Sequence, residues 1–183
     1  MTILLLNINV CGLAELQWER QGHFKTVDRN TTIYSGGKKQ GGHGVVVWLQ
    51  RNTAAALAGY EPISDRVLMI NLNAKPRNIT LIQVYAPTTA AEEHDVLGVY
   101  HSVMKAIKKT PKQNFLMMSG DFNAKVGKGA DGVVGPYGIG EANEAGDRLR
   151  DFCGQQDMLL ANTWFKHHPR WLYTWKSPNG KTD

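Results

Sequence analysis

Short runs of apolar residues, bounded by polar or turn-forming residues, recur along the chain and predict β-strands. Runs of about four to eight residues have the length of strands and are too short for most helices. The glycine- and lysine-rich stretch 36–42 stands between two of these runs and is typical of a hairpin connection. The predicted strands are 8–14, 31–34, 44–49, 66–72, 78–85, 114–119, 158–162 and 172–175.

Two segments have helical periodicity instead. Thr89 with Glu92 matches a capping box, and apolar residues then recur at every third or fourth position as far as Thr110-Pro111. A shorter segment, 145–156, places three apolar side chains on one face. Because strands outnumber helices and hairpins alternate with crossovers, the sequence predicts an α/β fold with mixed sheets.

The size and charge of the chain narrow its class. With 183 residues, 42% of them hydrophobic and 20% charged, the composition is that of one globular domain over 1–183. Lysine and arginine number 21 against 16 acidic residues, a net charge of +5. A basic excess of this size favours a polyanionic partner such as nucleic acid.

Cysteine usage and the absence of long apolar stretches bear on the compartment. Cys11 and Cys153 form neither a disulfide framework nor a zinc motif, and both are expected to be small buried residues. No apolar stretch is long enough to span a membrane, and the first residues lack the basic start of a signal peptide. We therefore expect an intracellular protein of the nucleus or cytoplasm, neither secreted nor bound to a membrane.

Polar residues with catalytic potential stand at the ends of three predicted strands. Glu15 follows the first strand, Tyr85 ends another, and Asp121 follows a third with Asn123 two residues on. In α/β proteins the strand ends hold ligands, because buried strands fix the backbone and the tips stay in water. Two carboxylates at such ends suit a hard cation such as Mg²⁺, and an Asp–Asn pair suits activation of water.

Each of these residues also has a plain structural interpretation. Gly-Asp-x-Asn after a strand is a common turn, because Asp and Asn bond their own backbone there. A single glutamate at a strand end is more often a solvated residue than a ligand, and Tyr85 before Ala-Pro is more often a core aromatic residue. The residue types alone therefore leave both interpretations open.

Basic and aromatic residues in the predicted loops suit contact with a nucleic-acid backbone. Lysine and arginine neutralise phosphates, and tryptophan stacks on bases. The glycine-lysine stretches do not match a phosphate-binding loop of the G-x-x-x-x-G-K-[ST] type, so no nucleotide cofactor is expected. The candidate nucleic-acid-binding residues are Lys38, Lys39, Lys125, Lys128, Arg170 and Trp175.

Seven short motifs, in order along nearly the whole chain, resemble the endonuclease/exonuclease/phosphatase superfamily. Within it the chain is most similar to the endonuclease domains of non-long-terminal-repeat retrotransposons and to the craniofacial-development-like proteins derived from them. The motifs are Cys11-Gly-Leu-Ala-Glu15 with Trp18, Tyr34-Ser-Gly-Gly, Gly42-His-Gly-Val-Val-Val, Gln83-Val-Tyr-Ala-Pro-Thr88, Gly120-Asp-Phe-Asn-Ala124, Asn143-Glu-Ala-Gly146 and Tyr173-Thr-Trp-Lys-Ser-Pro-Asn-Gly180.

The resemblance implies a four-layered α/β sandwich, two mixed sheets flanked by helices, that cleaves phosphodiester bonds of DNA with Mg²⁺ or alternatively Mn²⁺. By position in the motifs, Glu15 would be a metal ligand and Tyr85 would contact the scissile phosphate. Asp121 would activate the water, and Asn123 would orient it or bind the phosphate. A phosphatase of small phosphates within the same superfamily fits the motifs less well.

The sequence departs from the family pattern at both ends. Only 14 residues precede Glu15, so the family's opening strand-helix unit with its metal-site Asn has no counterpart, and its closing I-D-Y and S-D-H motifs would follow Asp183. We therefore expect an incomplete domain with impaired cleavage. The rival hypothesis is a non-catalytic module that binds nucleic acid, or a protein partner through exposed sheet edges.

Overall fold

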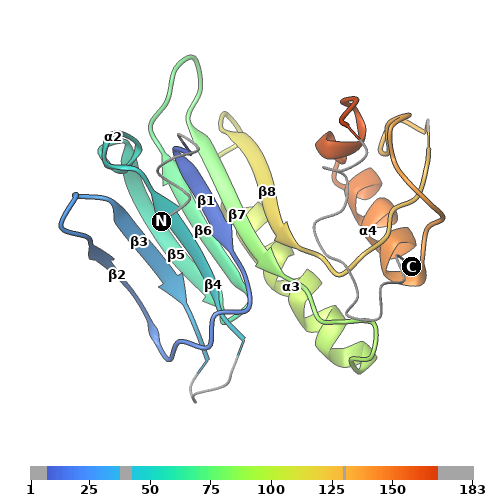
Figure 1. Cartoon of the computed structure of the whole chain (residues 1–183), viewed down its shortest axis with the longest axis horizontal. Coiled ribbons are helices and arrows are strands. Elements are labelled where there is room, and N and C mark those ends of the chain that lie inside the picture. The colour runs from blue at the N-terminus through green and yellow to red at the C-terminus, as the bar shows by residue number, and fades with distance from the viewer. Residues whose placement is uncertain (1–7, 38–42, 130, 169–183) are drawn as a thin grey trace. The chain divides into compact units, whose positions relative to one another are not determined.

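The computed structural model describes residues 8–37, 43–129 and 131–168. The chain divides into two compact units, Met1–Phe122 and Asn123–Asp183, and each is described by itself. Figure 1 traces the elements in chain order.

The first sheet of the first unit is antiparallel throughout. Its strand order is β1-β4-β3-β2, so the third and fourth strands of the chain form a hairpin at the sheet's centre. This confirms the hairpin predicted across the glycine-lysine stretch. The prediction of two mixed sheets is wrong for this sheet, and only the second sheet is mixed. The strands are β1 (Val10–Leu13), β2 (Gln21–Lys25), β3 (Thr31–Ser35) and β4 (Val45–Leu49).

The second sheet has the order β5-β6-β7-β8 and is mixed, because β7 and β8 run parallel. The pair predicted over 66–72 and 78–85 is confirmed as β6 and β7, which lie antiparallel. The short helix α2 (Arg51–Ala54) leads into this sheet. Its strands are β5 (Leu57–Ser64), β6 (Val67–Leu72), β7 (Ile79–Tyr85) and β8 (Phe115–Asp121).

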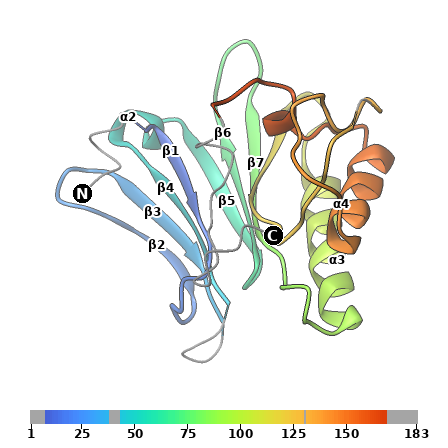
Figure 2. The same cartoon turned by 45° about the vertical axis from the view of Figure 1, so that its right-hand side comes forward.

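The two sheets are stacked on each other (Figure 2), and a buried apolar core lies between them. Its members alternate along their strands, as expected where one face of each strand points inward. Helix α3 (Glu93–Lys109) packs on β5, β6 and β7, and it buries Val99, Val103 and Ala106. The unit is therefore an α/β sandwich. The core cluster comprises Ile33, Val45, Val47, Leu49, Leu68, Ile70, Leu72 and Leu81.

Helix α3 confirms the predicted periodicity but not the predicted cap. It begins at Glu93 with Glu92 as N-cap, and no side chain caps it. A turn, in which the Ala91 amide donates to the Thr88 carbonyl, separates Thr89 from the helix, so the capping-box spacing is not used.

In the described part of the chain, no helix has both the length and the apolar character that crossing a bilayer requires.

Two strands predicted to be buried are partly exposed because they end their sheets. Along β8 the side chains alternate, with Phe115 58% and Met117 46% exposed. The first strand is shorter than predicted, and its Cys11 is only half-buried, whereas Cys153 is fully buried as expected. A strand at a sheet edge has fewer neighbours to cover it, which the apolar pattern alone does not reveal.

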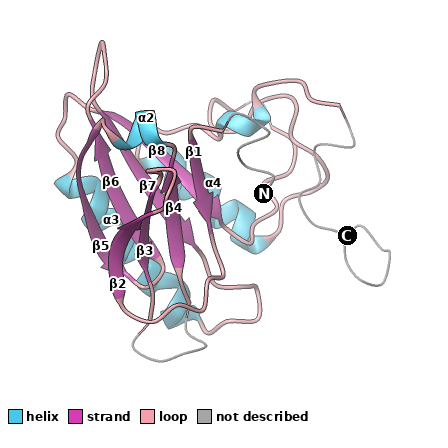
Figure 3. Cartoon of the chain, turned by 60° about the vertical axis from the view of Figure 1, so that its left-hand side comes forward, coloured by secondary structure: helices cyan, strands magenta, loops and turns pink. Residues whose placement is uncertain are grey.

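The second unit is built around helix α4 (Glu144–Gln155), which confirms the predicted helix over 145–156. The Asn143 side chain caps it by accepting from the Gly146 amide at 2.8 Å. The predicted strand 158–162 is wrong. There a single bridge at Leu160 precedes the 3₁₀ helix η1 (Ala161–Thr163), in which the Thr163 hydroxyl donates to the Leu160 carbonyl at 2.6 Å. Figure 3 colours the described helices and strands of the chain.

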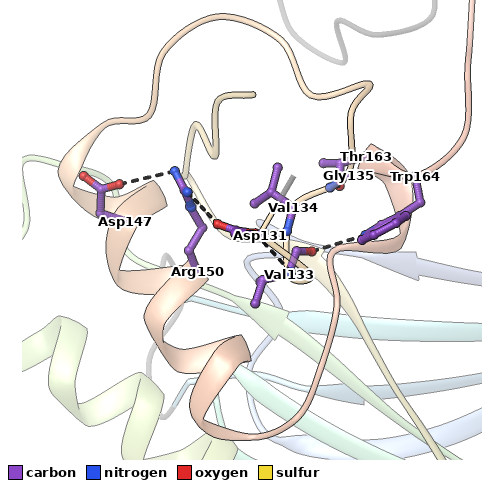
Figure 4. A network of polar contacts seen from close by, with 8 residues as sticks. All are labelled: Asp131, Val133, Val134, Gly135, Asp147, Arg150, Thr163 and Trp164. Atoms are coloured by element: carbon purple, nitrogen blue, oxygen red, sulfur yellow. Dashed lines mark hydrogen bonds and ion pairs between the residues drawn. The ribbon is translucent and has the colours of Figure 1, made fainter. Parts of the chain in front are cut away.

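Asp131 ties the glycine-rich loop to α4 (Figure 4). Its Oδ1 accepts from the amides of Val133 and Val134 at 3.0 and 2.8 Å, and its Oδ2 accepts from Arg150 at 2.7 Å. The Val134 amide bond is the largest cause that lowers the pKa of Asp131, from 3.8 to about 2, and the Arg150 bond is the next. The ionised carboxylate is therefore the form that this loop favours.

This pKa makes a prediction about acid stability. Because the folded-state pKa lies below the unfolded value, the stabilisation is present above about pH 4 and is lost as the pH falls through about 2. Asp131→Asn is expected to lower the Tm most above pH 4, and the difference from the unchanged protein should shrink toward pH 2. Thermal unfolding across this pH range measures it, with the exposed Asp28→Asn as matched control. A difference that stays constant with pH would contradict the assignment.

Candidate active site

Tyr85 and Asp121 lie side by side at the ends of two parallel strands. The register of β7 and β8 pairs Tyr85 with Asp121, and the Ala86 amide donates to the Asp121 carbonyl at 2.8 Å. The carboxyl ends of neighbouring parallel strands meet at one sheet edge, which is the usual place of ligands in α/β proteins. The Asp121 side chain is exposed there, whereas Tyr85 is half-buried.

Gly120 allows this close pairing. Its φ is +144°, and a Cβ at this position would lie 1.9 Å from the Val84 carbonyl oxygen on the neighbouring strand. Residues with a Cβ rarely adopt this backbone conformation, and the neighbouring strand leaves no room for a side chain here. The glycine before Asp121 is therefore required by the approach of β8 to β7.

Glu15 reaches the same place from the other sheet. It follows β1 with φ +63°, a left-handed conformation that is uncommon for a residue with a side chain. The Tyr85 hydroxyl donates to Glu15 Oε1 at 3.3 Å, across 70 positions of sequence. The structure thus brings together Glu15, Tyr85 and Asp121, three of the four residues predicted at strand ends.

Gln83 links the two sheets beneath this site. It is buried, its Nε2 donates to the Leu13 carbonyl at 3.5 Å, and its Oε1 accepts from the Ser119 hydroxyl at 2.6 Å. The contact with Leu13 fixes the end of β1, from which Glu15 projects. Sequence reasoning missed this residue, although a glutamine inside an apolar strand was a signal for a buried polar link.

Gln83→Leu is expected to lower the free energy of unfolding by about 2 kcal/mol, because the half-buried Ser119 hydroxyl and the Leu13 carbonyl lose their partner. Leucine has a similar volume, so packing changes little. Urea unfolding of the variant measures the loss. Gln83→Glu is a second variant, which retains the oxygen that accepts from the Ser119 hydroxyl. If Gln83→Leu is as stable as the unsubstituted protein, the role of Gln83 in linking the two sheets is contradicted.

The electrostatics of Tyr85 reflect its surroundings. Burial raises the pKa of the phenol most, and the neighbouring Glu15 carboxylate raises it next, because both oppose a phenolate. Asp121 acts in the same direction, whereas Arg66 lowers the pKa. The hydroxyl is therefore kept protonated, as a hydrogen-bond donor.

Two cationic or titratable side chains beside Tyr85 were not predicted. Arg66 lies with its guanidinium carbon 4.9 Å from the centre of the Tyr85 ring, and His43 lies with its ring centre at 5.9 Å. His43 Nδ1 is 3.9 Å from Asp65 Oδ2. His43 belongs to the motif Gly42-His-Gly-Val-Val-Val, but that motif assigned it no role. Nothing in the local sequence marked Arg66, since it approaches Tyr85 only through the pairing of β6 with β7.

The remaining predicted residues belong to the second unit or lie outside the described residues. Asn123, with φ +48°, follows Asp121 by two residues and begins the second unit. Lys125 and Lys128 are exposed in that unit. The predicted strand 172–175 lies outside the described residues. Four of the nucleic-acid-binding candidates also lie outside them, namely Lys38, Lys39, Arg170 and Trp175.

The donors at the site suit a hard cation that keeps most of its water. Glu15 and Asp121 are exposed carboxylates, and the phenol is a third oxygen. Within the described ranges, no group of three or more His, Cys, Asp or Glu is arranged to hold a metal. Mg²⁺ usually takes one or two carboxylates, with water and substrate phosphates as the other ligands. The residues therefore fit a loosely held Mg²⁺ and not a closed zinc centre.

The two stacked sheets have the α/β fold of the endonuclease/exonuclease/phosphatase proteins. Among solved structures, the chain is similar to the endonuclease domain of TRAS1, a telomere-specific non-LTR retrotransposon. The TM-score is 0.55 at 13% identity, over 84% of this chain and 62% of that one. A second is the 3′ phosphatase NExo from Neisseria bound to a product DNA hairpin, with a TM-score of 0.50 at 15% identity over 73% and 53%.

The chain is also similar in sequence to a curated relative. The chain is 38% identical to craniofacial development protein 2 of Tragulus javanicus over 177 residues, which cover 96% of this chain and 31% of the relative. The chain thus spans about a third of the length of this curated relative. No protein-family model matches the sequence. The predicted resemblance to retrotransposon-type endonucleases and craniofacial-development-like proteins is confirmed.

Proposed function

We propose that this chain hydrolyses phosphodiester bonds of DNA with Mg²⁺, at the site formed by Glu15, Tyr85 and Asp121. The observation that supports this most is the hydrogen bond of Tyr85 to Glu15, with Asp121 beside Tyr85 in strand register. The three side chains lie at or just beyond the ends of three strands that belong to two sheets.

The residue types suggest a division of roles. Glu15 would hold Mg²⁺, which when bound stabilises negative charge on the phosphate oxygens. The protonated Tyr85 hydroxyl would donate to a phosphate oxygen. Asp121 would take a proton from a water molecule while the oxygen of that water forms a bond to phosphorus. The phosphorus–oxygen bond to the leaving nucleotide would break in the same step. Asn123 would orient that water.

DNA is the substrate that charge and similarity favour. The chain carries a net charge of +5, and the similar solved structures are named as an endonuclease domain and as a phosphatase bound to a DNA hairpin. Exposed Lys125 and Lys128 would contact the backbone, as would the other basic candidates of the sequence. Two free cysteines among the described residues agree with the intracellular location that we propose.

A second candidate is a module that binds DNA, or a protein strand at a sheet edge, without cleavage. In the described ranges no three metal-ligating side chains converge, which favours this alternative. The strands β1 and β8 end their sheets, so each presents an edge for strand addition.

Nicking of supercoiled plasmid separates the two candidates. We expect the purified chain to convert supercoiled to open-circular DNA with Mg²⁺ and to stop when EDTA is added. Circular dichroism on the same sample establishes that the protein is folded. Folded protein that never nicks, with Mg²⁺ or Mn²⁺, would reject hydrolysis in favour of the binding module.

A further inference from the structure

We propose that Arg66 is a phosphate-binding residue of this site, the cation that receives the DNA backbone beside Tyr85. The inference rests on the proposed function and adds a residue to it. Arg66 directly precedes β6, and the antiparallel pairing of β6 with β7 places it next to the end of β7.

Arg66 and Tyr85 are joined at three points. The Tyr85 amide donates to the Arg66 carbonyl at 2.9 Å, and Arg66 Nη1 donates to the Tyr85 carbonyl at 3.3 Å. The guanidinium also lies over the Tyr85 ring, 4.9 Å from its centre. The cation is therefore held against the same side chain whose hydroxyl contacts Glu15.

The Arg66 backbone is itself held in place from both sheets. Its amide donates to the Ser64 hydroxyl at 3.3 Å, and the Ser64 carbonyl accepts from the buried Ser35 hydroxyl of the first sheet at 2.6 Å. A charged group fixed in this way needs little reorganisation when an anion arrives, which is the arrangement that binding sites favour.

The hydrogen-bonding capacity of Arg66 is mostly unused. A guanidinium has five N–H donors, and the contacts among the described residues use one, to the Tyr85 carbonyl. The side chain is half-buried, so solvent reaches it. Arginine with free donors matches the oxygens of a phosphate, and stacking on an aromatic ring is its usual companion contact.

The charge balance of the site also calls for a cation here. Glu15 and Asp121 both act on Tyr85 as negative charges, and Arg66 is the positive charge that opposes them. A phosphate brought beside two carboxylates is repelled, and a nearby cation reduces that repulsion. Arg66 is placed to supply this positive charge in addition to the Mg²⁺ proposed at Glu15.

DNA-binding titrations in EDTA test the inference without cleavage. Fluorescence anisotropy of a labelled duplex, repeated over a series of NaCl concentrations, gives the slope of log K against log salt. Arg66→Gln retains an N–H donor for Tyr85 but loses the charge. It is expected to weaken binding about tenfold at low salt and to reduce the slope by about 1, the value for one phosphate contact. Arg66→Lys should keep the slope.

Arg77→Ala is the matched control, because exposed Arg77 lies in the connection at the other end of the β6–β7 pair. It should leave the slope unchanged. An Arg66→Gln protein with the full slope would overturn the inference, and a lower Tm with that full slope would show that Arg66 only supports Tyr85. If the unchanged chain binds no DNA, both this inference and DNA as substrate are rejected. Binding without nicking rejects hydrolysis alone.

Discussion

Replacing Asp121 with asparagine is expected to lower the rate of Mg²⁺-dependent plasmid nicking by about 10²- to 10⁴-fold. Asparagine keeps the shape of the side chain but cannot take a proton from the attacking water, and general-base catalysis contributes a factor of this size. Asp121 is exposed at the end of β8, so the substitution leaves the core untouched. The initial rate of open-circle formation measures the effect.

Asp28→Asn provides the control, since it makes the same chemical change at an exposed position between β2 and β3. We expect it to nick at the rate of the unchanged protein. If Asp121→Asn nicks as fast as Asp28→Asn, Asp121 is not the base, and the Gly-Asp-x-Asn segment is only a turn.

Gly120→Ala is expected to destabilise the fold by about 3 kcal/mol and to lower the Tm by about 10 °C. The added Cβ would meet the Val84 carbonyl oxygen at 1.9 Å, a backbone atom that cannot move aside, and φ of +144° is strained for alanine. Relief requires β8 to move away from β7, which also displaces Asp121 from Tyr85. Thermal unfolding with nicking assays on the folded fraction measures both effects.

The matched change is Gly98→Ala in α3, where a Cβ meets nothing within 4 Å. Because alanine favours a helix over glycine, this variant is expected to gain about 0.5–1 kcal/mol. A Gly120→Ala protein as stable as Gly98→Ala would show that β7 and β8 tolerate separation, and would contradict the role assigned to Gly120.

Sequence reasoning succeeded where one element's own pattern decides its structure. The hairpins β3–β4 and β6–β7 and the helix α3 follow from apolar runs and helical periodicity. The strands β2 and β5 were missed, because Gln21–Lys25 is mostly polar and Leu57–Ser64 contains Gly59 and Pro62. Their pairing partners, not their own residues, make them strands.

The same contrast between local patterns and distant contacts applies to the residues of the candidate site. Glu15, Tyr85 and Asp121 could be named because each ends a strand, a property visible in the local sequence. Arg66 could not, because it acts through a contact with Tyr85, 19 positions away. Gln83 was visible as a polar residue in an apolar strand, but its contact with Leu13, 70 positions away, was not. Local patterns identify where strands stop, but not which side chains the assembled sheets bring against one another.

The position of Glu15 after β1 has a consequence for how the site fails. This strand has four residues and lies at the end of its sheet, so it is among the elements that open first by local fluctuation. Each opening carries Glu15 away from Tyr85 while the core between the sheets stays intact. We therefore expect the site to be lost at a lower temperature than the fold, unless the contact of Gln83 with Leu13 holds the end of β1 in place.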